Sequence, residues 1–245
     1  MKRFVLILIF LLALAAGLIA NTPMAWALRQ SPLGSLGFGW QQARGTVWKG
    51  EVLGLVREEV AMGSVQMTLR PVALVRGEPP FFATWTFGQS RAVANLGGGQ
   101  GAVVLTGVSA DVLLHEAAPD VAAALGVPDS RVRFQRGEIE YGATGCRRAT
   151  GVVTTDALAL MGLRLGQKLP DITGPVACEA GRLVTTLGGR AEDGTDIRLV
   201  VREGDMVTLT LDKFPAETGL ALSAAGYAVS GTHVEHTFPI VETVE

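Results

Sequence analysis

Apolar and polar residues form two patterns along the chain, a continuous apolar segment near the N-terminus and short alternating segments after it. Residues 4–20 carry no charged side chain and follow Lys2 and Arg3. A helix rising about 1.5 Å per residue through this segment and on to Trp26 is long enough to cross the roughly 30 Å hydrocarbon core of a bilayer. Because basic residues stay on the cytoplasmic side, the pattern predicts a cytoplasmic tip and transmembrane signal-anchor over residues 1–28, with residues 29–245 exported.

A cleaved signal peptide is the alternative interpretation of the same segment. Ala25 and Ala27 place small residues where a signal peptidase needs them, which predicts cleavage after Ala27. The apolar segment is longer than the usual signal-peptide core, and Pro23 interrupts it only after a full span, so we favour the uncleaved anchor. Both alternatives export the body of the chain.

Past Leu28 the chain changes to short segments in which apolar and polar residues alternate, the period of strands with one buried face. The expected strands lie at residues 46–48, 51–60, 64–69, 102–105, 131–135, 182–187, 197–201 and 206–211. Glycine-containing turns are expected between them, because glycine supplies the positive φ of tight turns. The expected turns are Gly97-Gly98-Gly99, Gly188-Gly189, Asp193-Gly194 and Glu203-Gly204-Asp205, and Asp193-Gly194 is the clearest hairpin in the chain.

Three stretches interrupt the alternation and predict short helices at residues 109–125, 155–163 and 215–225. Ser109 is a candidate N-cap for the first helix, and Pro215 suits the first turn of the third. The fold class predicted is mainly β, with an N-terminal transmembrane helix followed by an antiparallel β-sheet domain that carries a few short helices. No linker clearly divides this body, although the Pro79-Pro80 step and residues 97–101 are the places to look for one.

Composition supports a folded core and excludes several functions. The chain has 245 residues, of which 48% are hydrophobic, and a net charge of -2, so it has no global positive field to hold nucleic acid. Its 2 cysteines are too few for a four-thiolate zinc site or a four-cysteine iron–sulfur cluster.

The two cysteines, Cys146 and Cys178, lie next to glycines at the edges of expected strands. In an oxidising space outside the cytoplasm, a chain with two thiols most simply pairs them, so we expect a disulfide. A redox-active pair and a metal site are the alternatives. The wide spacing of the cysteines, unlike Cys-x-x-Cys, and the lack of a neighbouring histidine favour the structural bridge.

No motif in the sequence predicts a catalytic residue, a metal site or a cofactor, and we expect no enzyme. The segment His233-Val-Glu235-His236 lacks the downstream cysteines of a zinc deaminase, and on a strand its two histidines point to opposite faces. His115 has no serine in a nucleophile elbow to act on. Residues 97–101 lack the Lys-Ser/Thr ending of a phosphate loop. The tryptophans expected to pack in the core or at its rim are Trp40, Trp48 and Trp85.

Several short motifs resemble the type II secretion system protein N family. They are Cys146 and the segments 45–51 (GTVWKGE), 156–158 (DAL), 174–183 (GPVACEAGRL), 214–215 (FP) and 224–227 (AAGY). The most specific part is the spaced cysteine pair with its G-P-x-x-C-x-x-G context. The likeness runs over nearly the whole chain.

This resemblance implies a single-pass inner-membrane component of the Gram-negative type II secretion system, the apparatus that moves folded proteins from the periplasm to the exterior. The body of the chain would then lie in the periplasm. The implied role is accessory and non-enzymatic, with other secretion subunits as partners and with no cofactor and no small-molecule substrate. Only Cys146 and Cys178 carry over from the family as site residues, as a disulfide pair.

Two functional hypotheses follow. The first is an interaction subunit that uses exposed strand edges and the membrane helix to contact other secretion components. The second is an AsmA-like periplasmic protein that handles lipid, because the segment 45–50 also resembles AsmA-like β-proteins. A lipid groove predicts an inward row of apolar side chains that the protein leaves unfilled, whereas an interaction subunit predicts a closed core with polar exposed faces. We favour the first hypothesis.

Overall fold

The structure is a computed structural model, and it describes residues 17, 21–30, 38–57, 60–99, 101–119, 122–123, 126–164, 166, 168–203, 206–224 and 226–239. These residues contain fourteen β-strands with antiparallel pairing and a few short helices. The mainly β fold predicted from the alternating pattern is therefore confirmed. The chain divides into two compact units, Met1–Gly88 and Gln89–Glu245, at a point between the two places where the sequence suggests a boundary.

The first unit contains four strands, which pair in the order in which they follow one another in the sequence. They are β1 (Phe38–Gly45), β2 (Lys49–Arg57), β3 (Val60–Leu69) and β4 (Phe81–Phe87). Helix α2 (Met24–Gln30) packs on this sheet and buries Met24 and Leu28 against Val52. Gly50 makes room for the helix, because a Cβ there would lie 2.9 Å from Cγ of Met24.

The first unit also contains helix α3 (Pro71–Arg76), which connects β3 to β4. Proline stands at its first turn, and Gly77 ends it in the left-handed conformation with its N–H bonded to the carbonyls of Ala73 and Leu74. Ala73 is the one buried residue of this helix.

The second unit contains ten strands, again paired almost entirely with their neighbours in sequence. They are β5 (Ser90–Gly99), β6 (Ala102–Leu113), β7 (Arg131–Gly142), β8 (Gly145–Thr155), β9 (Ile172–Glu179), β10 (Arg182–Arg190), β11 (Asp196–Arg202), β12 (Met206–Asp212), β13 (Val229–Ser230) and β14 (His233–Pro239). The order departs from the sequence only at its end, where β14 pairs with β12 and the two-residue β13 lies outside it.

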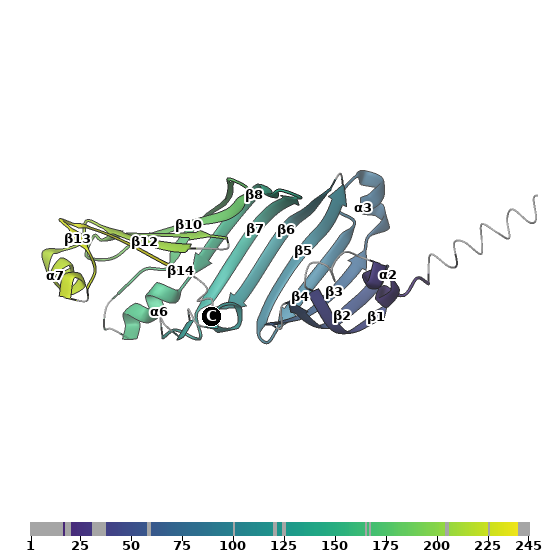
Figure 1. Cartoon of the computed structure of the whole chain (residues 1–245), viewed down its shortest axis with the longest axis horizontal. Helices are drawn as coiled ribbons and strands as arrows, with labels where there is room; N and C mark the ends of the chain where they lie inside the picture. The colour runs from purple at the N-terminus through teal and green to yellow at the C-terminus, as the bar shows by residue number, and fades with distance from the viewer. Residues whose placement is uncertain are drawn as a thin grey trace, which may run out of the picture. The chain divides into compact units, whose positions relative to one another are not determined.

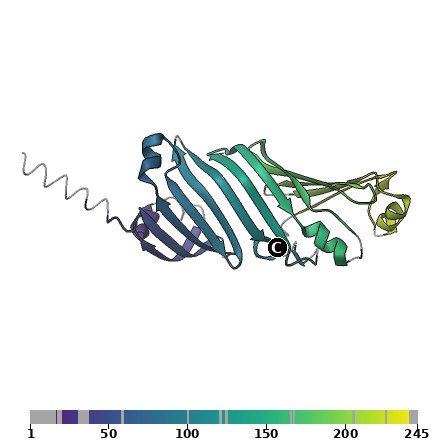
Figure 2. The same cartoon turned by 180° about the vertical axis from the view of Figure 1, so that it is seen from behind.

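Short helices accompany these strands, among them α4 (Leu114–Ala117), α6 (Ala157–Arg164) and α7 (Ala216–Ala224). Figure 1 shows the strands from β5 to β8 running side by side, with α7 next to β13. The same strands are seen from behind in Figure 2. Each of these helices lies where the chain leaves one strand and returns to the next, so the sheet is built from successive hairpins.

Two of the hairpins are closed at their open ends by a buried serine and a carboxylate. In the β5–β6 hairpin, Glu116 accepts hydrogen bonds from the hydroxyl and the backbone N–H of Ser90, whose hydroxyl accepts one from Leu113 N at 2.9 Å. In the β7–β8 hairpin, Asp156 accepts from Ser130 Oγ at 2.9 Å and from Arg131 N at 2.8 Å. The Ser90 hydrogen bond is the main reason that the pKa of Glu116 is lowered. Asp156, which belongs to one of the motifs noted above, therefore has a structural role.

The expected helices are confirmed in two places and in part at the third, where residues 109–113 are strand and residues 114–117, 119 and 122–123 are helical. Residues 155–163 and 215–225 correspond to α6 and α7. Residues 109–113 instead continue strand β6, because they pair with β5 on one side and β7 on the other, and only Leu114–Ala117 forms helix α4. Residues 120, 121, 124 and 125 of the same expectation lie outside the described part of the chain.

The expected turns are also corrected in part. The Asp193-Gly194 turn is confirmed between β10 and β11, where Gly194 has a φ of 90°. Gly188-Gly189 lies inside β10, and Gly97–Gly99 pairs with β6 so that the turn moves to Gly101. The expected strand at 46–48 is wrong, because these residues form the tight connection between β1 and β2, with Thr46 N bonded to Lys49 O at 3.0 Å.

Among the residues that the structure describes, no helix is both long and apolar enough to span a membrane. Of the predicted signal-anchor, residues 1–28, the structure describes Gly17 and residues 21–28, and the rest of the apolar segment 4–20 lies outside the described residues.

The close approach of β9 and β10 can be tested at Gly174. A Cβ at this position would lie 1.8 Å from the carbonyl oxygen of Thr186, so we expect Gly174→Ala to lower the free energy of unfolding by about 1–3 kcal/mol or more. Gly188→Ala is the matched control, because its Cβ would lie 3.6 Å from the carbonyl oxygen of Ile197. Guanidinium unfolding of the purified full-length chain measures both, and equal midpoints would contradict the expected crowding at Gly174.

Candidate functional site

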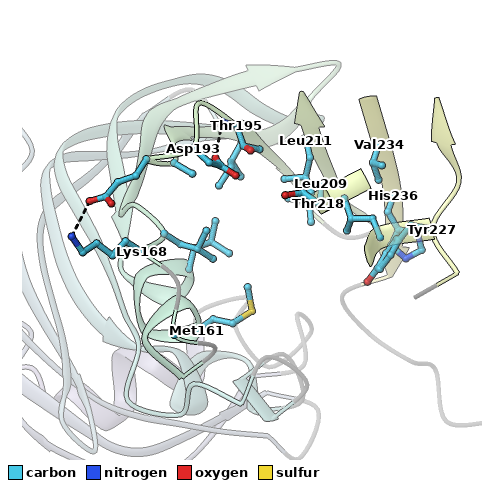
Figure 3. A pocket seen from close by; sticks show the side chains of 17 residues that line it. Met161, Lys168, Asp193, Thr195, Leu209, Leu211, Thr218, Tyr227, Val234 and His236 are labelled. Carbon is cyan, nitrogen blue, oxygen red and sulfur yellow. Dashed lines mark hydrogen bonds and ion pairs between the residues drawn. The ribbon is translucent and has the colours of Figure 1, made fainter. Parts of the chain in front are cut away.

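The second unit contains an apolar cavity of about 630 Å³ that is partly open to solvent (Figure 3). Helices α6 and α7 and strands β11, β12 and β14 contribute its walls. The apolar lining residues are Leu158, Met161, Leu169, Ala191, Ile197, Leu209, Leu211, Leu222 and Val234. This volume falls within the range of about 300–1,000 Å³ that is typical of ligand pockets.

Strand register explains why one wall of the cavity is apolar. Ile197 of β11 lies directly opposite Leu211 of β12, and Leu211 lies opposite Val234 of β14. Directly opposite residues of an antiparallel pair share a face, so these three side chains form one row across three strands. Leu209, two residues before Leu211, extends the apolar surface on that face.

Polar groups lie at the rim of the cavity. Lys168 forms an ion pair with Glu192 at 3.3 Å, and the rings of Tyr227 and His236 meet edge to face with centroids 5.2 Å apart. Figure 3 shows Lys168 and the Tyr227–His236 pair on different sides of the opening. The rim therefore carries both signs of charge and an aromatic edge.

One polar group of the lining has no partner. The backbone N–H of Thr195 donates to Asp193 Oδ1 at 2.9 Å, but its hydroxyl is the one buried side-chain polar atom of the described residues without a hydrogen bond. Thr195 is only 5% exposed. Buried hydroxyls are nearly always bonded, so this one indicates a missing partner.

The cavity is an observation that the lipid-handling hypothesis predicts, because its apolar row is not filled by the protein. It is confined to the region from α6 to β14, and so it supports a discrete binding site. Apolar side chains are also exposed elsewhere, above all on α3, where the interaction hypothesis expected polar faces. An exposed apolar patch of this kind is nevertheless typical of a protein contact surface.

The structure contains the disulfide between Cys146 and Cys178. Cys146 is buried with Ala149 and Val176, so the bridge lies inside an apolar cluster. The ladder between β8 and β9 covers only the stretch from Val152 to Thr155, and the disulfide joins the same two strands at their other ends. The bridge therefore replaces backbone pairing where the two strands separate.

Tyr141 packs against the apolar cluster that surrounds the disulfide. The Tyr141 hydroxyl donates to Glu203 Oε2, which also accepts from Leu183 N at 2.9 Å. Burial and this hydrogen bond raise the pKa of Tyr141, so its neutral form is strongly favoured. Tyr141 and Leu183 both pack against the Cys146 cluster, and the contact ties β7 to the residue that follows β11.

Charged residues line up at one end of β10 to β12. Asp196 accepts from Arg190 Nε at 2.6 Å and from Lys213 Nζ at 2.8 Å, and the two bonds lower its pKa, the Arg190 bond most. In the next position of the row, His233 Nδ1 lies 2.7 Å from Asp212 Oδ1. Asp196 with Arg190 and Lys213 forms an ion-pair network on the surface, an arrangement that is commonly structural.

The histidines considered in the sequence do not converge. His233 is paired with Asp212, His236 contacts Tyr227, and His115 Nδ1 lies 2.7 Å from the carbonyl oxygen of Pro128. Within the described ranges, no group of three or more His, Cys, Asp or Glu side chains is placed to hold a metal ion.

The three tryptophans expected in the core or at its rim, Trp40, Trp48 and Trp85, are all half-buried. Trp40 packs against the α2 cluster, and Trp85 Nε1 donates to the carbonyl oxygen of Met62 at 2.5 Å.

Sequence reasoning did not find the cavity. The alternation that includes Leu209 and Leu211 predicts only that one face of the strand is buried. Whether the buried face is filled depends on how far α6 and α7 stand from it, and no local sequence pattern reports that distance.

These elements define a class of protein, a mainly antiparallel β-protein stabilised by one disulfide and carrying a small apolar cavity. Comparison with known families shows that residues 37–233 match the family model of type II secretion system (T2SS), protein N. The match covers well over half of the chain, and the chain belongs to this family. Membership implies an accessory role in type II secretion and a place in the cell envelope. Comparisons with curated proteins and with solved structures gave no match.

The stabilising effect of the disulfide can be measured directly. We expect Cys146→Ala with Cys178→Ala to lower the free energy of unfolding by about 3–4 kcal/mol, because a bridge across a sequence separation of 32 restricts the unfolded chain. Denaturant unfolding with and without reductant tests this. The wild-type chain should lose stability on reduction and the double variant should not respond. An unchanged wild-type midpoint would contradict the stabilising role.

Proposed function

We propose that the chain is a membrane-anchored accessory component of the type II secretion system, which contributes to the export of folded proteins through contacts with other secretion subunits. The observation that carries the proposal is the family match over residues 37–233. In this proposal the body lies in the periplasm and residues 1–28 form the cytoplasmic tip and the inner-membrane signal-anchor.

The disulfide supports the periplasmic location. Bridges between cysteines persist in oxidising compartments and are rare in the cytoplasm, where thiols are kept reduced. Cys146 and Cys178 are bonded, and there is no free cysteine among the described residues.

The packing of α2 supports an anchor that is retained. Cleavage after Ala27 would cut this helix and remove Met24, which is only 4% exposed, from the cluster with Val52. It would also remove Thr22, whose carbonyl oxygen accepts from Val47 N at 3.1 Å. The folded first unit therefore uses residues that a signal peptidase would take away.

The apolar surface of α3 supports a contact with another subunit. Val72, Leu74 and Val75 are 63%, 55% and 90% exposed, and Arg70 and Arg76 flank them. Exposed apolar side chains gathered on one short helix are typical of a protein–protein contact. In this proposal the helix docks on a subunit of the secretion system.

The proposal includes no catalytic step. The carboxylates of the described chain that have lowered pKa values, Glu116 and Asp196, are held by structural hydrogen bonds to Ser90, Arg190 and Lys213. Groups of this kind stabilise strand ends and are not aimed at a shared substrate position.

The location of the chain is tested in intact cells. We expect an alkaline phosphatase fused after Glu245 to be active, because that enzyme folds only outside the reducing cytoplasm. We also expect the intact mass of the membrane-extracted chain to include residues 1–27. A green fluorescent protein fused at the same place is the control and should stay dark. An inactive phosphatase would contradict the periplasmic body, and a mass that begins at Leu28 would contradict the retained anchor.

The contact surface is tested by capture from detergent-solubilised inner membrane. We expect the full-length chain to recover type II secretion subunits, and Val75→Asp to reduce that recovery by roughly tenfold, because a charge in a dry contact is costly. Val60→Asp is the matched control, since Val60 is 67% exposed in the same unit but lies outside α3. Secretion of a type II substrate by cells that carry each variant should follow the capture. Equal recovery by both variants would contradict the role of α3, and capture of no secretion subunit by the wild-type chain would contradict the proposed function.

A further inference from the structure

We propose that the cavity of the second unit binds a single-chain amphiphile with a zwitterionic head, with the apolar chain inside and the head at the rim. The bound molecule is a ligand and undergoes no reaction. This inference does not depend on the secretion role, because it rests on the lining of the cavity alone.

The apolar walls argue for a hydrocarbon occupant. The cavity is partly open to solvent, and its volume of about 630 Å³ is large enough for a hydrocarbon chain, within the range typical of ligand pockets. The row formed by Ile197, Leu211 and Val234 offers no hydrogen bonds to water. Cavities lined by such side chains stay dry or take up apolar molecules.

The orphaned hydroxyl argues for a polar group on the same ligand. Thr195 lines the cavity, is 5% exposed, and leaves its hydroxyl without a partner. Its backbone N–H is already bonded to Asp193. An oxygen of a ligand head would satisfy the hydroxyl, and a pure hydrocarbon would not.

The charges at the rim of the cavity favour a zwitterionic head group over an anionic one. Lys168 offers a cation, and Glu192 and Asp193 offer anions, with Glu192 3.3 Å from the Lys168 ammonium. The side chains of Lys168 and Glu192 are 78% and 71% exposed, so both can reorient toward a ligand. A head that carries both signs of charge matches this rim better than a simple anion, which the two carboxylates would repel.

The test uses photolabelling of the full-length chain in membrane vesicles. The probe is a lysophosphatidylcholine whose single acyl chain carries a diazirine, and peptide mass spectrometry locates the adduct. We expect adducts on the cavity residues Met161, Leu209 and Leu222. We expect no adduct on Val200, which lies on the opposite face of β11 and pairs with Thr208.

Two variants separate binding from folding. Leu209→Trp fills the cavity and should lower labelling by roughly tenfold, the scale on which apolar pockets respond to a change of volume. The matched control, Val200→Trp, adds the same bulk on the other face and should leave labelling unchanged.

Thr195→Val keeps the shape of the side chain and removes the unpaired hydroxyl. We expect labelling to fall about fivefold, because the ligand loses a hydrogen bond. We expect the midpoint of thermal unfolding to rise, because the variant no longer buries a hydroxyl without a partner. A merely structural residue would move both readouts in the same direction.

Three results would overturn the proposal. Labelling that is equal in the wild-type chain and Leu209→Trp would mean that the probe binds elsewhere. Labelling by a diazirine fatty acid that exceeds labelling by the lysophosphatidylcholine would contradict the zwitterionic head. A benzophenone amino acid placed at Leu222 that cross-links only to a protein would make the cavity a protein-docking site. The first two results do not bear on whether the chain captures secretion subunits, and the third would not contradict that capture.

Discussion

The antiparallel register of β10 to β14 is the constraint on which the second unit depends. Side chains alternate between the two faces of a strand, so a shift of one residue would move every side chain of that strand to the other face. In the observed register, Ile197, Leu211 and Val234 form the apolar row of the cavity. The same register sets Arg190 opposite Asp196 at the end of the sheet. An apolar wall and an ion-pair network are thus two results of one alignment.

The ends of the hairpins need interactions of their own, because a ladder of backbone hydrogen bonds weakens where strands separate. Ser90 with Glu116 and Ser130 with Asp156 close two successive hairpins by the same means, a buried hydroxyl bonded to a carboxylate. Between β8 and β9 the disulfide takes this role, and the Tyr141–Glu203 hydrogen bond adds a contact that reaches past the neighbouring strand. These serines and carboxylates are bonded to one another at the strand ends, so their proximity is explained by the closing of the hairpins.

The two units carry different features that bear on function. In the first unit, helix α2 follows the N-terminal apolar segment and packs into the core of that unit. Helix α3 of the same unit exposes apolar side chains. The second unit holds the disulfide and the cavity. An accessory secretion protein with this division would attach and dock through its first unit and bind a ligand in its second. The contrast drawn from the sequence between an interaction subunit and a lipid-binding protein is therefore not exclusive, because each hypothesis is supported by a different unit.

The sequence by itself determined the fold class, the helices α6 and α7, the Asp193-Gly194 turn and the family, because each depends on local periodicity, caps or short motifs. Tertiary structure decided the rest. Residues 109–113 became strand because β5 and β7 both offered hydrogen bonds to them, which outweighs a local preference for helix. Gly188 and Gly189 became strand because β11 lies opposite them. The cavity was decided by the distance between helices and strands that are remote in sequence, and the physical reason is that empty space is a property of packing, to which every wall contributes and which no single segment encodes.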